Sequence, residues 1–279
     1  PSFPRGGAAD KTPRYQSYSV GHETFTIPEY LDQLQGPMGA GFYGVVCSAR
    51  DTRTNERVAV KKIRGAFNNP EDAKRTIREA RLLRHIRHKN IISFNEILPP
   101  SADLSFDSIY VVMELMDTDL FQIIKSQQKL TADHILYFMY QLMLGLQYIH
   151  SFDVVHRDLK PANLLVNKDC ILKICDFGMA RVIGPAHEQS QMTEYVVTRW
   201  YRAPEVLLRT CGYTKALDMW SVGCIFAELL LGAPIFPGKN HTHQMQIVLE
   251  VLGSPSEHVW NTVTNGGRSS ALFGNMGRE

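Results

Sequence analysis

Several features that mark common protein classes are missing from this sequence. The five cysteines are scattered and form no C-x-x-C pair, which excludes an obvious zinc site and fits a reducing compartment. The formal net charge of +2 over 279 residues gives no reason to expect nucleic acid or an anionic membrane as the main partner. The longest apolar run, 219–236, contains Glu228 and Pro234, so it predicts a buried helix and no insertion into a membrane. No internal repeat is visible.

What is present is a short polar motif, His156-Arg157-Asp158-Leu159-Lys160-Pro161-Ala162-Asn163. Transfer of a phosphoryl group from ATP to a hydroxyl needs such a set. Asp158 would accept or orient the hydroxyl proton, Lys160 would neutralise charge on the moving group, and Asn163 would hold magnesium. A basic surface loop could look the same in isolation, so the motif predicts this chemistry only if the other required parts follow in order. Asp218 is expected to cap the helix of the apolar run and to brace this loop.

A glycine-rich segment lies upstream, at Gly39-Ala40-Gly41-Phe42-Tyr43-Gly44-Val45-Val46. Its G-x-G-x-x-G-x-V pattern could also open a dinucleotide-binding Rossmann unit, in which a helix follows the glycines. Here 45–49 and 58–61 are strand-like and a turn lies between them, which favours a loop whose backbone amides cover phosphates. Pro37 cannot donate to a sheet ladder, so we expect the first strand to start late or fray.

The second of these strands ends in Lys61, which we select over Lys62 by its spacing after Ala59 as the lysine that contacts the α- and β-phosphates. Because side chains alternate along a strand, Lys62 is then expected to lie in solvent. An amphipathic helix over about 70–87 would supply Glu79, the carboxylate that holds Lys61 against the phosphates.

A short apolar strand at 171–175 ends in Asp176-Phe177-Gly178, and Ala203-Pro204-Glu205 follows further along. Asp176 is placed to ligate magnesium between the β- and γ-phosphates. With all these parts in order, the sequence resembles the eukaryotic protein kinases. Thr193-Glu194-Tyr195 and the residues after it are similar to those of a mitogen-activated protein (MAP) kinase of the extracellular-signal-regulated type, and in particular of the big MAP kinase branch. The resemblance covers about 38–258, and its small departures remove no chemical group that the mechanism needs. These departures are Phe42, Ala162 and Val197.

The resemblance implies an α+β, two-lobed protein kinase fold, with a small β-rich N-lobe that has one regulatory helix and a larger, mainly helical C-lobe. We expect a flexible N-terminal segment at 1–28 and a kinase domain at 29–260, divided into an N-lobe at 29–115 and a C-lobe at 116–260. A divergent, disordered tail is expected at 261–279. Because the resemblance stops before the later helices of the C-lobe, the domain is expected to be truncated and incomplete.

The resemblance also implies the residues that bind ATP. These are Met38, Gly39, Ala40, Gly41, Phe42, Tyr43, Gly44, Val46, Ala59, Lys61, Met113, Glu114, Met116, Asp119 and Leu165. In this set Val46, Ala59 and Leu165 would sandwich the adenine, with Met113 behind it. Asp119 could reach the ribose, but it could as well cap the helix that follows. The magnesium ligands would be Asn163 and Asp176.

Phosphorylation of Thr193 and Tyr195 is expected to switch the protein on, because a phosphate adds nearly two negative charges and is well bound by arginines. The arginines expected to coordinate the phosphates are Arg78, Arg157, Arg181, Arg199 and Arg202. The first three would meet phosphorylated Thr193 and couple the helix of Glu79 to the catalytic loop. The last two would meet Tyr195 and shape a pocket for a proline after the target residue. Thr198 is implied to contact Asp158 and Lys160.

The sequence therefore predicts a proline-directed serine/threonine kinase that uses ATP and Mg²⁺. The implied partners are an upstream dual-specificity MAP kinase kinase, phosphatases, and protein substrates with Ser/Thr-Pro sites, such as transcription factors, in the cytoplasm and nucleus. Two alternatives stay open. One is a catalytically impaired truncated isoform or fragment that binds activators or scaffolds. The other is a different proline-directed kinase, such as a cyclin-dependent one, against which Thr193-Glu194-Tyr195 argues.

Overall fold

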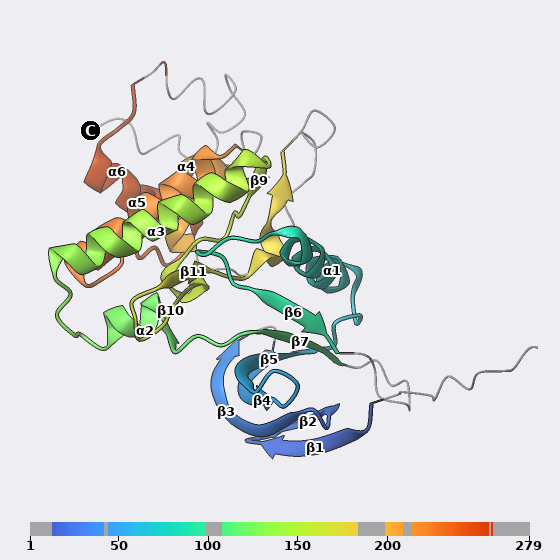
Figure 1. Ribbon diagram of the computed structural model, residues 1–279. Helices are drawn as coiled ribbons and strands as arrows, with labels where there is room; N and C mark the ends of the chain where they lie inside the picture. The colour runs from blue at the N-terminus through green and yellow to red at the C-terminus, as the bar shows by residue number, and fades with distance from the viewer. Residues whose placement is uncertain are drawn as a thin grey trace, which may run out of the picture. The chain divides into compact units, whose positions relative to one another are not determined.

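The computed structural model describes residues 13–41, 44–98, 108–183, 199–208, 214–256 and 258. The chain divides into two compact units, Pro1–Thr76 with Ser93–Leu115 and Ile77–Ile92 with Met116–Glu279. The first unit is built on β-sheet and the second mainly on helices (Figure 1), which confirms the predicted α+β class. Residues 1–12 of the predicted N-terminal segment 1–28, and the whole predicted tail 261–279, lie outside the described residues.

The elements follow one another in an order that separates sheet from helix. The strands are β1 (Tyr15–Val20), β2 (Glu23–Pro28), β3 (Leu31–Gly41), β4 (Gly44–Asp51), β5 (Glu56–Arg64), β6 (Phe94–Ile97), β7 (Ser108–Glu114), β8 (Thr118–Asp119), β9 (Val154–Val155), β10 (Leu164–Val166), β11 (Leu172–Ile174) and β12 (Arg181–Val182). The helices are α1 (Pro70–His85), α2 (Leu120–Lys125), α3 (Ala132–Ser151), α4 (Pro204–Leu208), α5 (Ala216–Leu231) and α6 (His241–Leu252). Single 3₁₀ turns lie at Pro161–Asn163, Phe177–Met179 and Arg199–Tyr201.

The first unit is a five-stranded antiparallel sheet with the order β3-β4-β5-β7-β6, accompanied by a β1–β2 hairpin. The expectation of a flexible segment over 1–28 is wrong for 15–28, where β1 and β2 pair from Tyr15 with Pro28 to Val20 with Glu23. Composition suggested disorder because the segment is polar. The hairpin forms because Phe25 and Ile27 of β2 are fully buried against the sheet.

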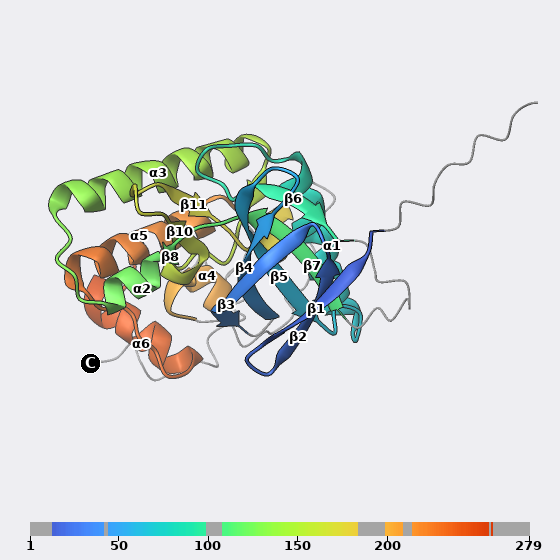
Figure 2. The same cartoon turned by 60° about the horizontal axis from the view of Figure 1, so that its bottom comes forward.

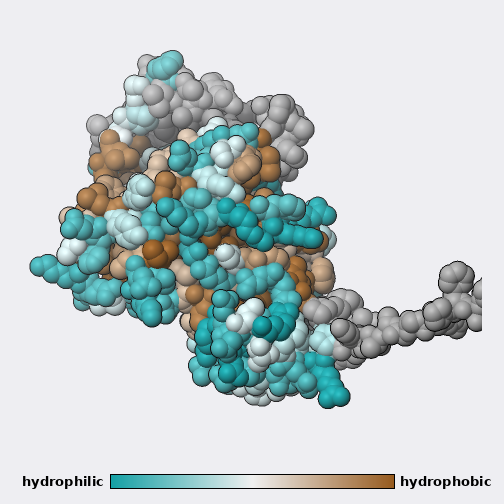
Figure 3. Space-filling view, viewed as in Figure 1, coloured by the Kyte–Doolittle hydropathy of each residue, from teal (hydrophilic) through white to brown (hydrophobic). Residues whose placement is uncertain are grey.

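The hairpin covers one face of the five-stranded sheet, as two views of the molecule show (Figures 1 and 2). Successive side chains of a strand point to opposite faces, so one face collects alternate residues. The covered face forms a hydrophobic core with Phe25 and Ile27 and includes Val45, Cys47, Val58, Val60 and Val112. The surface over the hairpin is largely hydrophilic (Figure 3), as expected for the outer layer of such a sandwich.

Strand β3 continues through Pro37, so the expectation that it starts late is wrong. It pairs with β4 from Leu31 opposite Asp51 to Gly41 opposite Gly44, with irregular register between Asp32 and Gly39. Bulged pairing accommodates a residue that cannot donate to the ladder, which is why the strand persists.

Residues 77–92 belong to the second unit, whereas the predicted division placed them in the N-lobe. Three contacts explain this grouping. Arg78 Nη1 donates to the carbonyl oxygen of Gly178 at 2.8 Å, and Asn90 Nδ2 donates to that of Leu172 at 2.9 Å. Ile91 forms a parallel bridge with Ile174. The second half of α1 and the segment after it are thus bound to strand β11 and the turn that follows.

The second unit is organised around α3 and α5. Helix α5 overlaps the helix predicted in the apolar run 219–236 but extends from Ala216 to Leu231. Helix α3 begins at a capping box formed by Thr131 and His134. Within α5, Asp218, Ser221 and Glu228 are buried among apolar side chains. Among the described residues, no helix is long and apolar enough to cross a membrane.

Candidate active site

The loop after β9 brings three predicted catalytic and metal-binding residues together. Lys160 Nζ donates to Asp158 Oδ2 at 2.9 Å, and Asn163 Nδ2 donates to the same oxygen at 3.1 Å. Asn163 Nδ2 also donates to the main-chain oxygen of Asp158 at 2.7 Å, which closes the loop on itself. One carboxylate oxygen of Asp158 is thereby fixed. Among the described residues of the loop, neither Lys160 nor Asn163 bonds to the other oxygen, which is therefore the one to meet a substrate hydroxyl.

The carboxylate of Asp218 braces this loop from α5, as predicted. It is fully buried and accepts the backbone N–H of His156 at 2.9 Å and that of Arg157 at 2.8 Å. Asp218 does not cap α5, because it lies in the first turn of the helix and Lys215 holds the cap position. A third donor, His150 Nε2 on α3, lies 2.8 Å from Asp218 Oδ2. Sequence reasoning missed His150, since nothing local marks a helical histidine as a partner of a residue 68 positions away.

His156 connects the loop to the strand that carries Asp176. Its Nε2 lies 2.9 Å from the carbonyl oxygen of Cys175, and its Nδ1 accepts the N–H of Asp158 at 3.3 Å. A carbonyl can only accept, so Nε2 carries the proton and Nδ1 is the acceptor of a neutral ring. The ring is fully buried and meets Phe177 edge-on at 4.9 Å between centroids.

Electrostatics make Asp158 a stronger base than an ordinary aspartate. Burial raises the pKa of its carboxyl, Lys160 lowers that pKa, and the negative charge of Asp176 raises it again. The net direction is upward. A carboxylate with a raised pKa holds a proton more tightly, which suits a group that accepts a hydroxyl proton.

The donor set around Asn163 and Asp176 fits a magnesium ion. Both hydrogen bonds of the Asn163 amide to Asp158 use its nitrogen, so its oxygen is the atom left for a metal. The backbone N–H of Cys175 donates to the main-chain oxygen of Asn163 at 3.0 Å, which joins the two segments. Asp176 follows in a left-handed backbone conformation (φ 64°, ψ 68°). Within the described ranges, no group of three or more His, Cys, Asp and Glu residues could form a metal cage. Magnesium commonly takes only one or two protein ligands together with phosphate oxygens, so this sparse oxygen set agrees with it.

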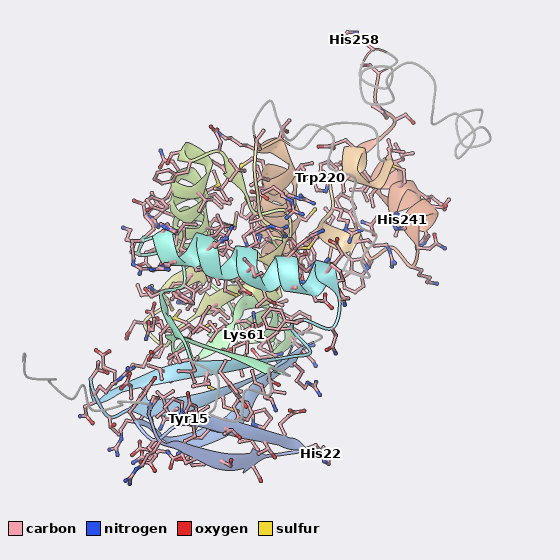
Figure 4. All side chains as sticks on the ribbon, turned by 90° about the vertical axis from the view of Figure 1, so that its right-hand side faces the viewer. Tyr15, His22, Lys61, Trp220, His241 and His258 are labelled. Atoms are coloured by element: carbon pink, nitrogen blue, oxygen red, sulfur yellow. The ribbon has the colours of Figure 1, made fainter. Side chains whose placement is uncertain are left out.

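In the first unit, strand register gathers the predicted nucleotide residues on one face. Val46 pairs with Lys61 across β4 and β5, Ala59 pairs with Met113 across β5 and β7, and Gly39 pairs with Val46. Paired residues share a face, so these side chains lie opposite the face covered by the hairpin. Figure 4 shows Lys61 on the side of the sheet away from the hairpin residues Tyr15 and His22. Met38 also lies on β3, where it is exposed.

Gly44 begins β4 with a backbone conformation (φ +154°) that other residues rarely adopt. A Cβ added there would lie 1.8 Å from the carbonyl oxygen of Lys62, so only glycine fits against this strand. Ala40 and Gly41 lie in β3, while Phe42 and Tyr43 lie outside the described residues.

The remaining nucleotide residues fall in both units. Glu114 ends β7, and its N–H donates to the carbonyl of Ser93 at 3.0 Å. In the second unit Met116 is buried, and Leu165 pairs with Asp119 across β10 and β8. Asp119 Oδ1 accepts the N–H of Gln122 at 2.8 Å and so caps α2. Of the two roles expected for the Asp119 side chain, the helix cap is present, and contact with a ribose stays a prediction.

Lys61 belongs to the first unit and Glu79 to the second, so their pairing also stays a prediction. Lys62 was expected to lie in solvent, and this expectation is wrong. Its Nζ forms an ion pair with Glu23 at 3.0 Å, and only 12% of its side chain is exposed. The prediction that Lys61 and Lys62 point to opposite faces of β5 is confirmed. The sequence did not indicate that the hairpin covers the face of Lys62.

Two of the predicted phosphate-binding arginines contact the segment around the Asp176 turn. Arg78 Nη1 donates to Gly178 O at 2.8 Å, and Arg181 Nη1 donates to Ala180 O at 3.2 Å. Arg157 has a positive φ of 71° in the catalytic loop. Arg199 Nη1 donates to the Lys239 carbonyl at 3.2 Å, and the N–H of Arg202 donates to the carbonyl of Arg199 at 3.1 Å. Thr193, Tyr195 and Thr198 lie outside the part of the chain that the structure describes.

Comparison with known proteins finds relatives over most of the chain. The family model for the protein kinase domain matches residues 33–269. Mitogen-activated protein kinase 3 of Arabidopsis thaliana is 55% identical over 244 residues, which cover 88% of this chain and 65% of that protein. Extracellular signal-regulated kinase 1 of Dictyostelium discoideum is 54% identical over 263 residues, which cover 94% of this chain and 49% of that protein. For mitogen-activated protein kinase 5 of Oryza sativa subsp. indica the identity is 50% over 265 residues, or 95% of this chain and 69% of the relative. The chain thus spans between about half and about two thirds of the length of these curated relatives.

Proposed function

Because the chain belongs to the protein kinase family and, within it, to the MAP kinases, we propose that it transfers the γ-phosphoryl group of ATP to serine or threonine hydroxyls followed by proline. The observation that carries this proposal is the geometry of Asp158, whose carboxylate is held by Lys160 and Asn163 on a loop braced by Asp218. A fixed carboxylate beside a fixed ammonium is what in-line transfer to a hydroxyl requires.

The roles follow from the chemistry of each group. Asp158 orients the acceptor hydroxyl and accepts its proton, while Lys160 offsets charge on the transferred group. Asn163 and Asp176 would hold magnesium, and Lys61 would contact the phosphates from the face of the first unit's sheet that lies opposite the hairpin. When bound, ATP with Mg²⁺ supplies the activated phosphoryl group and neutralises part of its charge.

Regulation and partners are proposed from the activation motif and from the relatives. Thr193 and Tyr195 would be phosphorylated by an upstream dual-specificity MAP kinase kinase and dephosphorylated by phosphatases. Phosphate on Thr193 would recruit Arg78, and this residue is already joined to the Gly178 carbonyl, so the phosphate would act on the turn that positions Asp176. Substrates would be proteins with Ser/Thr-Pro sites in the cytoplasm and nucleus.

The test is transfer of labelled γ-phosphate by the purified chain after treatment with an activating MAP kinase kinase. The acceptors are a Ser-Pro peptide and its Ser-Ala twin. We expect transfer to the Ser-Pro peptide alone and its loss in Asp158→Asn, with Asp169→Asn on an exposed turn as the matched control. A folded chain that binds ATP and transfers nothing would instead support a fragment that acts by binding activators or scaffolds.

A further inference from the structure

Glu23, the first residue of β2, joins the hairpin to the end of β5. Its Oε2 accepts from Lys62 Nζ at 3.0 Å and its Oε1 from Arg64 Nη1 at 2.9 Å. Lys62 Nζ also donates to the carbonyl oxygen of Thr24 at 2.7 Å. Only 16% of the Glu23 side chain and 12% of the Lys62 side chain are exposed. Solvent screens such a covered pair less than a pair on the open surface.

A second set of contacts fixes the hairpin to the neighbouring strand. The N–H of Thr26 donates to the hydroxyl of Tyr110 at 3.0 Å, and Tyr110 is the β7 residue paired with Lys62. The ring of Phe25 lies 5.8 Å from the ring of Tyr110 and is fully buried. The polar contacts of the hairpin with β5 and β7 therefore gather around the register position of Lys62 and Tyr110.

On β5 the same position borders two elements of the nucleotide face. Lys61 precedes Lys62 and points to the opposite face. The backbone of Gly44, the last glycine of the glycine-rich segment, packs closely against the Lys62 carbonyl oxygen. Gly44 also pairs with Ile63 of β5. A displacement of the strand end at Lys62 would therefore move both the Lys61 side chain and the backbone of Gly44.

We propose that Glu23 is a positioning residue for nucleotide binding, through which the β1–β2 hairpin holds the strand end that carries Lys61 and seats Gly44. This inference rests on the proposed kinase function, since it takes the face of the sheet opposite the hairpin as the site for ATP. Glu23 lies on the covered face, so it acts through strand β5 and not by contact with the nucleotide. Its loss should weaken ATP binding and leave the hydroxyl-activating loop of the second unit unchanged.

The experiment compares Glu23→Gln with Glu29→Gln in the full chain. Glu29 follows the same hairpin, is exposed, and its side chain makes no ion pair or hydrogen bond with any described residue. Affinity is measured with a fluorescent ATP analogue and Mg²⁺, and KM for ATP and kcat are measured with the Ser-Pro peptide. In Glu23→Gln we expect the dissociation constant and KM to rise about three- to tenfold with kcat within about twofold, because a uniform binding contribution is lost. Glu29→Gln should match wild type, and Glu23→Asp should restore part of the affinity.

Two outcomes decide against the inference in distinguishable ways. If wild type binds the analogue and Glu23→Gln binds it equally well, at a lower melting temperature, the hairpin is only structural and the inference is overturned alone. If wild type binds no nucleotide, the proposed function fails and the inference with it. Arg64→Gln removes one of the two ion pairs of Glu23, at a side chain that is 55% exposed. This variant keeps the test decisive should Glu23→Gln not fold. It should raise both constants about twofold, and unchanged constants would overturn the inference.

Discussion

Asp218 holds Arg157 in a left-handed backbone conformation. The Arg157 N–H donates to Asp218 Oδ1 at 2.8 Å, and Arg157 has a φ of 71°. A residue other than glycine keeps such a conformation only when its surroundings over-determine it. The buried carboxylate on α5 provides that constraint one residue before Asp158.

Replacement of Asp218 by alanine should therefore destabilise the protein and disorganise the catalytic loop. The N–H groups of His156 and Arg157 would lose their acceptor in a buried place, at a cost of about 1–3 kcal/mol each. We expect the free energy of unfolding to fall by about 2–5 kcal/mol in urea titrations and kcat to fall at least about tenfold. Asp169→Ala, on an exposed turn, should change the stability by less than about 0.5 kcal/mol. Equal stability of the two variants would contradict the bracing role.

Asp158→Asn should abolish transfer and at the same time stabilise the fold at neutral pH. Burial raises the pKa of Asp158 in the folded state. Between the ordinary aspartate pKa and this raised value, the folded state binds more protons than the unfolded state, so the free energy of unfolding falls as the pH rises through that range. The neutral asparagine removes this dependence. Thermal unfolding at a series of pH values should show a stability advantage of the variant that grows from acid to neutral pH, and a constant or reversed difference would refute it.

Gly44→Ala should damage the first unit far more than Gly39→Ala. A Cβ at Gly44 would lie 1.8 Å from the Lys62 carbonyl oxygen at a φ of +154°, whereas a Cβ at Gly39 would meet nothing within 4 Å. We expect Gly44→Ala to lower the free energy of unfolding by roughly 1–3 kcal/mol or more, and Gly39→Ala to change it by less than about 1 kcal/mol. Urea titration of both variants decides the point. A larger loss in Gly39→Ala would contradict the close approach of Gly44 to Lys62.

Tyr201→Phe tests a buried hydrogen bond between the 3₁₀ turn at Arg199–Tyr201 and helix α5. The Tyr201 hydroxyl donates to Glu228 Oε2 at 2.6 Å, and Glu228 is 2% exposed. Burial raises the pKa of Glu228, and the bond from Tyr201 opposes that rise. Loss of the donor should cost about 1–3 kcal/mol, because the carboxyl group stays buried without its partner. Tyr137→Phe, at an exposed ring on α3, is the control and should be close to neutral in the same denaturation experiment.

Much of the fold could be predicted because its signals are local. The strand after the glycines, the strand of Lys61 and helix α1 depend on the pattern of residues within a few positions, and all three lie where expected. The proximity of Asp158, Lys160 and Asn163 was also predictable, because a tight loop leaves residues two to five positions apart little room to separate.

Three of the failures share one cause, which is pairing between distant residues. The β1–β2 hairpin was predicted as a flexible segment because its polar composition does not reveal the apolar face that Phe25 and Ile27 bury. Lys62 was placed in solvent because Glu23 lies 39 positions away. Residues 77–92 were assigned to the first unit because the bonds from Arg78 and Asn90 to the second unit span 100 and 82 positions.

The sequence by itself determined which chemistry the chain is suited to, since the identity and order of Lys61, Asp158, Asn163 and Asp176 admit few other uses. The class of fold followed from the resemblance of these motifs to those of the protein kinases. Only the tertiary structure decided how those groups are held. The carboxylate that fixes the loop of Asp158, the histidine that supports this carboxylate, and the hairpin behind the face that carries Lys61 all come from elsewhere in the chain. Their positions depend on burial and hydrogen bonding between segments distant in sequence, and no local pattern encodes them.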